Sequence, residues 1–332
     1  MKILGIDLGT SNMLACDEKG KIFLNEPSVI AFSKKKGEII ALGNRAREMI
    51  GKTHEDIEAI HPVKNGAITD QKVFESIVKK ILKMKYRGLL SRPKICITTH
   101  SGTTNVEKRA LYEAAINAGV KEVYFIQETL ASAIGAGFSV SEAKGVLLVN
   151  IGGGTTDISI ISLGGVVVGD TLKTAGKSLD EAIMMHMRQK YSMVIGENTA
   201  EEIKNKIGIA HPDEEKLSLE VKGRKIVDGS PVSATVSSED VYEAILEPLK
   251  NIAAKIKEII ERTPPELISD ILEEGVILTG GVSLMKGIHK FISESLNMKV
   301  KKIENPVTCV IEGIGFIFNS KDLLNEICEK MP

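Results

Sequence analysis

Several features are scarce or absent in this sequence of 332 residues. It has no tryptophan, and no stretch reaches the roughly 18 consecutive apolar residues that a membrane-spanning helix needs. The first residues enter a strand-like pattern at once, which leaves no room for a signal peptide. These absences predict a globular protein of the cytoplasm.

An excess of charge of either sign is also missing. The 43 Lys and Arg residues nearly balance the 44 Asp and Glu residues, for a net charge of −1. A general nucleic-acid binder would usually be basic, so we expect no nucleic-acid partner. The six histidines form no HxxxH pair, which makes a zinc site unexpected. Reduced thiols in or near the core are expected for the four scattered cysteines, which are Cys16, Cys96, Cys309 and Cys328.

Two common nucleotide-binding motifs are absent as well. No GxxxxGK[ST] occurs, since the first glycine of "GDTLKTAGKS" (169–178) lies seven residues before Gly176 instead of five. No GxGxxG follows a strand pattern, so a dinucleotide-binding Rossmann site is not expected.

Two glycine-rich turns are present instead, in "ILGIDLGTSNMLA" (3–15) and "LLVNIGGGTTDISII" (147–161). Each reads as an apolar strand, a polar residue (Asp7 or Asn150), a glycine turn with Thr, and a second apolar strand. Glycine lets backbone N–H groups approach an anion, and the hydroxyls add donors. Two such turns facing each other would hold a polyphosphate from both sides. The alternative is a pair of ordinary tight hairpins.

A third glycine turn lies in "LTGGVSLMKGI" (278–288), where a strand pattern runs into a helix pattern. A helix N-terminus at Gly280 and Gly281 would offer free N–H groups, and the close backbone would suit a flat ring such as adenine. The alternative is a βα turn with a packing role only.

The alternation of strand and helix patterns indicates the α/β class. Helices are expected over 178–192, capped by Ser178, and over 199–208, capped by Thr199. A longer helical pattern over 238–263 is expected to break at Pro248. The element order restarts at residue 145, so we expect two related halves with a cleft between them.

The order of "GIDLGTSN", "QETLASAIGAG", "NIGGGTTD", "GENTAEEIKNKIG" and "GVILTGGVSL" resembles the actin-like ATPase superfamily. Further stretches, "LNEPSVIAF" and "TPPELISDILEEGVILTGG", resemble its bacterial MreB family, and the likeness covers nearly the whole chain. The resemblance implies an actin-like fold of two RNase H-like domains, each with an inserted subdomain, around a nucleotide cleft. Domain I would comprise 1–144 and 311–332 with its subdomain at about 30–63, and domain II would comprise 145–310 with its subdomain at about 179–243.

The resemblance also implies that the cleft binds ATP with Mg²⁺. The phosphates would meet Thr10, Ser11 and Asn12 from one side and Gly153, Gly154, Thr155 and Gly176 from the other. The ribose and adenine would meet Glu201, Lys204, Gly280, Gly281, Val282 and Ser283. Val282 departs from the family, which has a third glycine there, and this puts the geometry of the loop in question.

By the same resemblance, Glu128 orients the attacking water and Thr155 is its hydroxyl partner. The family's Glu-Glu-Pro is Gln127-Glu128-Thr129 here, so the second, functional glutamate is kept. The metal would be held through water by Asp7 and by position 150, where the family has aspartate. Asn150 keeps the shape and loses the charge, so ATP binding should persist better than turnover.

The function implied is that of an ATP-binding, filament-forming cytoskeletal protein that sets cell shape, with slow ATP hydrolysis. A nucleotide-binding structural filament with negligible ATPase activity is the alternative. An Hsp70-type chaperone would need a large substrate-binding domain after the segments quoted above. A sugar kinase would need a second substrate pocket with its own catalytic base. Neither is indicated.

The implied partners are further copies of the chain and paralogous MreB-like subunits, such as wall-less helical bacteria use. The segment 263–272 is a candidate filament contact, or else an internally packed helix. Leu89 and Leu90, flanked by basic residues, predict peripheral attachment to the inner face of the cell membrane. The alternative is a loop whose leucines enter the core.

Overall fold

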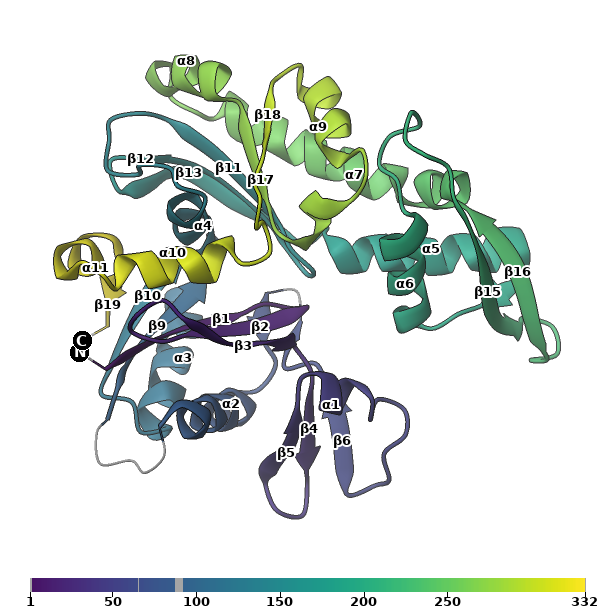
Figure 1. Cartoon of the computed structure of the whole chain (residues 1–332), viewed down its shortest axis with the longest axis horizontal. Coiled ribbons are helices and arrows are strands. Elements are labelled where there is room, and N and C mark those ends of the chain that lie inside the picture. Colours follow the sequence, from purple (N-terminus) through teal and green to yellow (C-terminus); the bar gives the residue numbers. More distant parts are fainter. Residues whose placement is uncertain (1, 65, 87–91, 332) are drawn as a thin grey trace.

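Two sheets form the centre of the structure, a computed structural model that describes residues 2–64, 66–86 and 92–331. The first sheet has six strands in the order β19-β10-β9-β1-β2-β3 (Figure 1). Its strands are β1 (Ile3–Leu8), β2 (Asn12–Cys16), β3 (Ile22–Pro27), β9 (Lys94–Thr99), β10 (Glu122–Gln127) and β19 (Glu329–Lys330). Strands β1, β9 and β10 are parallel, so their carboxyl ends meet at one edge. Helix α2 (Gln71–Lys85) leads into β9, and α3 (Asn105–Asn117) connects β9 to β10.

The second sheet has five strands in the order β13-β12-β11-β17-β18. Its strands are β11 (Val146–Ile151), β12 (Thr156–Ser162), β13 (Gly165–Leu172), β17 (Val276–Thr279) and β18 (Val300–Lys302). Every residue of β11 and β12 is buried, as continuous apolar runs predict for strands covered on both faces. The helices of this half are α5 (Gly176–Tyr191), α7 (Ser238–Glu261), α8 (Pro265–Glu274) and α9 (Ile288–Leu296), with the 3₁₀ helix η1 (Gly281–Leu284).

Helices α4 (Glu128–Gly135) and α10 (Cys309–Ile317) lie between the two sheets (Figure 1). Their backbones touch, because a Cβ at Gly135 would collide with the carbonyl of Cys309 and one at Gly313 with that of Ala131. One buried apolar cluster includes α10 and strands of both sheets. The contact therefore fixes the start of α4, where Glu128 lies. Helix α11 (Lys321–Ile327) follows toward the C-terminus.

Two smaller lobes project on the same side of the molecule (Figure 1). The first lobe contains β4 (Ile30–Ser33), β5 (Glu38–Leu42), α1 (Asn44–Arg47) and β6 (Ile57–Ile60), and the short hairpin of β7 (Val63–Lys64) and β8 (Ala67–Ile68) follows it. The second lobe contains β14 (Met193–Val194), α6 (Glu197–Ile207), β15 (Ser218–Lys225) and β16 (Pro231–Ser237). An ion pair of 2.5 Å between Arg47 and Glu201 joins the lobes.

Helix α5 begins two residues earlier than predicted, at Gly176. Ser178 is the third residue of the helix, and its hydroxyl accepts a hydrogen bond from the N–H of Ala175. Ser178 therefore satisfies a backbone N–H at the helix start, but it does so from the first turn of the helix and not from the cap position. The prediction was wrong because a glycine at the start gives no side-chain signal.

Two other helix predictions were wrong. Helix α6 starts at Glu197, so Thr199 lies within its first turn and is not the cap. Helix α7 continues through Pro248 without a break. A proline inside a helix costs about 3 kcal/mol, but seven buried apolar residues along α7 offset that cost.

Candidate functional site

A cleft of about 530 Å³ opens between the two sheets and receives the ends of their strands. Residues from all three glycine turns and from α6 line it. The predicted residues that line it are Asp7, Thr10, Ser11, Asn12, Glu128, Asn150, Gly153, Gly154, Thr155, Gly176, Glu201, Lys204, Gly280, Gly281 and Val282. One cleft thus brings together residues from distant parts of the chain.

The first two glycine turns face each other across this cleft. A Cβ at Gly153 would collide with the hydroxyl of Ser11, and one at Gly154 with the side chain of Thr10. Glycine is therefore needed at both positions for the turns to approach. The N–H of Gly176, the first residue of α5, donates to the carbonyl of Gly152 at 3.0 Å, so a helix N-terminus adjoins the same turn.

The third turn differs from the predicted direct entry into a helix, because η1 intervenes before α9. Gly280 has φ of 85°, and a Cβ there would collide with the carbonyl of Ile151. Val282 lies in η1 with ordinary backbone geometry, so its side chain is compatible with the turn. Ser283 is not among the residues lining the cleft. It is buried, and its hydroxyl donates to the carbonyl of Gly280 at 2.7 Å, which stabilises the turn.

Glu201 and Lys204, the predicted ribose and adenine contacts, have partners within the protein. Glu201 pairs with Arg47. Lys204 pairs with Asp180 at 2.7 Å and donates to the carbonyl of Gly176 at 3.1 Å. Burial raises the pKa of Asp180 to about 6, although Lys204 opposes the shift. Lys204 therefore ties α6 to the start of α5.

Glu128 lies at the floor of the cleft and is nearly buried. Its Oε2 accepts a hydrogen bond from the Nδ2 of Asn150 at 3.2 Å. Burial raises the pKa of Glu128 to about 8. His100 opposes this shift, and the nearby carboxylates of Asp7 and Asp157 add to it. The chain thus holds a carboxyl group whose protonation changes close to neutral pH.

Asp7 and Asn150, the predicted metal residues, also lie at this floor. The Oδ1 of Asp7 accepts from the hydroxyl of Thr98 at 2.8 Å, and burial raises the pKa of Asp7 to about 6. The Oδ1 of Asn150 accepts from the hydroxyl of Thr279 at 3.4 Å. A carboxylate and an amide oxygen at a cleft floor are suitable donors for a hydrated Mg²⁺, which keeps several of its waters.

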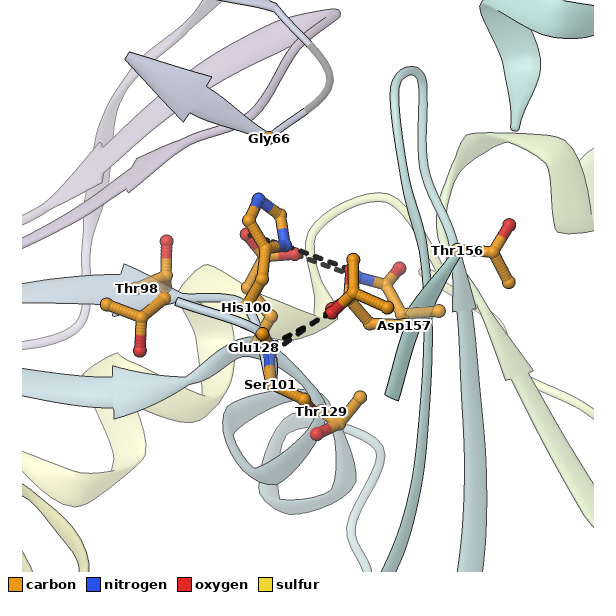
Figure 2. A network of polar contacts seen from close by, with 12 residues as sticks. Gly66, Thr98, His100, Ser101, Glu128, Thr129, Thr156 and Asp157 are labelled. Carbon is orange, nitrogen blue, oxygen red and sulfur yellow. Dashed lines mark hydrogen bonds and ion pairs between the residues drawn. The ribbon is translucent and has the colours of Figure 1, made fainter. Parts of the chain in front are cut away.

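His100 is the residue that the sequence reasoning missed. Its Nδ1 lies 2.9 Å from Oδ2 of Asp157 and 3.5 Å from Oε1 of Glu128 (Figure 2). Burial alone lowers the pKa of His100, but the carboxylates of Glu128 and Asp157 outweigh it and raise the pKa to about 10. A signal existed: His100 directly follows the buried strand β9, and Glu128 directly follows its parallel neighbour β10.

The predicted membrane contact cannot be placed, because Leu89 and Leu90 lie outside the described residues. Among the helices that the structure describes, none is long and apolar enough to cross a bilayer. The four cysteines are buried free thiols, as predicted.

Comparison with known proteins identifies relatives along the whole chain. A family model described as MreB/Mbl protein matches residues 1–326. Cell shape-determining protein Mbl of Bacillus subtilis (strain 168) is 42% identical over 97% of both chains. Cell shape-determining protein MreB of Escherichia coli (strain K12) is 41% identical over 94% of this chain and 92% of its own.

Solved structures agree with these relatives. MreB5 of Spiroplasma citri bound to ADP superposes with a TM-score of 0.91 at 34% identity over 98% of both chains. The same protein bound to AMPPNP gives 0.90 at 35% identity over 95% of both chains. The MamK double helical filament, at 22% identity and a TM-score of 0.80, shows a shared fold. The fold is therefore actin-like, as the sequence resemblance implied.

Proposed function

Because the chain belongs to the MreB/Mbl family of cell shape-determining proteins, we propose that it binds ATP with Mg²⁺, polymerises and hydrolyses ATP slowly. The observation that supports this most directly is the pair of facing glycine turns, where Ser11 and Thr10 contact Gly153 and Gly154. Two turns at this distance present hydroxyls and backbone to a polyphosphate from opposite sides. Related chains bind AMPPNP and ADP.

Glu128 orients the attacking water in this proposal, with Thr155 as its hydroxyl partner in the same cleft. The ionised carboxylate of Glu128 accepts hydrogen bonds at both oxygens and can take up a proton from water. The protonated carboxyl group instead has an O–H donor on one oxygen. Because burial raises the pKa of Glu128 to about 8, a protonated form that cannot take up a proton competes with the ionised form near neutral pH. This favours slow turnover.

Asp7 and Asn150 would hold the metal through its water shell. Mg²⁺ supplies positive charge to the phosphate oxygens when it is bound. Asn150 offers a neutral oxygen where a carboxylate would add charge. The same residue donates to Glu128 and so helps to fix the water-orienting group.

A nucleotide-binding filament protein with negligible ATPase activity is the second candidate, and the neutral Asn150 is the observation that favours it. Phosphate release measured beside nucleotide affinity separates the two. Tight nucleotide binding, with phosphate release no faster than in a control without protein, would favour the structural filament protein.

The finer features follow from the family likeness. We propose the domain limits given above, with the lobes as subdomains. Head-to-tail filaments are supported by the actin-like fold. The segment 263–272, most of which belongs to α8, is a candidate contact because Leu272 is 59% exposed. Ile271 of the same helix is buried, so α8 also packs internally. Attachment through Leu89 and Leu90 would place the filaments at the inner membrane face.

The test of ATP binding is Gly153→Ala against the matched control Gly165→Ala. A Cβ at Gly153 meets Ser11, whereas one at Gly165 meets open space. We expect Gly153→Ala to abolish binding of a fluorescent ATP analogue and the control to keep it. Electron micrographs with and without ATP then test polymerisation. Equal binding by both variants would contradict the proposed cleft.

A further inference from the structure

The two halves of the molecule are linked at the cleft floor by a carboxylate–imidazole pair. His100 follows β9 of the first sheet, and Asp157 lies on β12 of the second (Figure 2). Their side chains are only 13% and 1% exposed. A buried pair of this kind is costly unless its polar atoms are satisfied, so its orientation is determined by the surrounding donors.

Asp157 is held by three donors, two from the turn that follows β9 and one from β13. Its Oδ2 accepts from Nδ1 of His100 at 2.9 Å, and its Oδ1 accepts from the hydroxyl of Thr171 at 2.7 Å. The backbone N–H of Ser101 also donates to Oδ1, at 3.4 Å. The carboxylate is thus fixed, and it fixes the imidazole in turn, with Nδ1 bearing a proton.

The oriented imidazole faces the carboxyl group of Glu128. Nδ1 of His100 lies 3.5 Å from Oε1 of Glu128, while Nδ2 of Asn150 donates to Oε2 at 3.2 Å. The two oxygens of Glu128 therefore have two different partners, one from each sheet. Removing either partner would free one side of the carboxyl group.

We propose that His100, oriented by Asp157, is a positioning residue for ATP hydrolysis that holds Glu128 in the geometry needed to orient the attacking water. The inference rests on the proposed ATPase function. His100 touches neither phosphate nor water in this role; it acts through Glu128.

The competing explanation is that His100 only links the two sheets and stabilises the fold. Ser101 provides a matched control, because its hydroxyl lies 3.2 Å from that of Ser159 and so links the same sheets without contacting Glu128. Ser101→Ala removes this link and keeps the backbone N–H that reaches Asp157. A purely structural role predicts that His100 and Ser101 variants change the measured properties to a similar extent. A positioning role predicts that only the His100 variants change them.

The first measurement uses nucleotide-free protein labelled with ¹⁵N-histidine. The six histidines are assigned with the help of His100→Asn. We expect Glu128→Gln to shift the Nδ1 signal of His100 and Ser101→Ala to leave it in place. An unchanged chemical shift of His100 Nδ1 in Glu128→Gln would overturn the inference.

The second measurement compares the affinity for ADP with that for ADP plus aluminium fluoride, a mimic of the transferring phosphoryl group, both with Mg²⁺. His100→Leu should weaken the aluminium fluoride complex about tenfold, since small misplacements of catalytic groups have large effects, and leave ADP affinity nearly unchanged. His100→Asn, which keeps a donor near the position of Nδ1, should restore most of the loss. Ser101→Ala should affect neither complex.

Equal effects of His100→Leu and Ser101→Ala, or no rescue by His100→Asn, would overturn the positioning role while the proposed function stands. Failure of the unaltered protein to bind ATP would overturn the proposed function and this inference with it. If His100→Leu does not fold, the comparison of His100→Asn with Ser101→Ala and the histidine spectra still decide the question.

Discussion

Asn150→Asp introduces a carboxylate at the proposed metal site, and the distance from Asn150 to Glu128 gives the size of the expected effect. The Nδ2 of Asn150 lies 3.2 Å from Oε2 of Glu128. Two carboxylates at that distance repel by about 5 kcal/mol at an effective dielectric constant of about 20. Because the pKa of Glu128 is already about 8, the nucleotide-free variant keeps one proton on the pair throughout the neutral range.

The pH dependence of stability should therefore match that of the parent near pH 7 and diverge at higher pH. In the parent, Glu128 ionises near pH 8. Above that pH it is ionised in both the native and the unfolded state, so its contribution to the free energy of unfolding no longer changes with pH. In the variant the native state retains the proton above pH 8 while the unfolded state does not. The free energy of unfolding then falls relative to the parent by about 1.4 kcal/mol per pH unit.

With Mg²⁺ and ATP bound, the cation offsets the added charge. Phosphate release should rise about tenfold, which corresponds to about 1.4 kcal/mol of transition-state stabilisation, with nucleotide affinity nearly unchanged. Thr279→Val is the matched control, because it removes the hydroxyl that donates to Asn150 without adding charge. Equal release rates in parent and Asn150→Asp would mean that the missing carboxylate does not limit this site.

Three further outcomes are expected. Glu128→Gln should reduce phosphate release about a hundredfold or more at unchanged ADP affinity; in urea unfolding it should also flatten the fall in stability between the ordinary carboxyl pKa of 4.5 and about 8, where native Glu128 keeps a proton that the unfolded chain loses. Gly135→Ala should cost about 3 kcal/mol in urea unfolding, because its Cβ meets the carbonyl of Cys309, whereas Gly165→Ala should cost little. Replacing Leu89 and Leu90 by serine should reduce co-sedimentation with anionic liposomes, and unchanged binding would exclude these leucines as the membrane contact.

The glycine turns were predictable because their signal is local. An apolar strand, a polar residue and consecutive glycines specify a hairpin tip within about ten residues. That the two tips face each other followed from their repetition along the chain, and the contact of Gly153 with Ser11 agrees with it. The local pattern also singled out Asn150, but the roles predicted for Asn150 and Glu128 came only from the family resemblance.

The contacts of His100 and Arg47 were not predictable from spacing. His100 meets Asp157 across 57 positions of sequence, and Arg47 meets Glu201 across 154. Each pair forms only when two sheets or two lobes come together, and no local pattern encodes that. The start of α5 at Gly176 was missed for the opposite reason, since the glycine gives no cap signal of its own.

The backbone contact between α4 and α10 has a mechanical consequence. Side chains in a packed interface can change rotamer and yield, but at Gly135 and Gly313 carbonyl groups occupy the space directly and nothing is free to yield. Such a contact behaves as a stiff pivot. A rotation of the two sheets about it displaces nearby Glu128 slightly and the distant lobes much more. Such a rotation would change the distance between the lobes, and with it the ion pair of Arg47 and Glu201 that joins them.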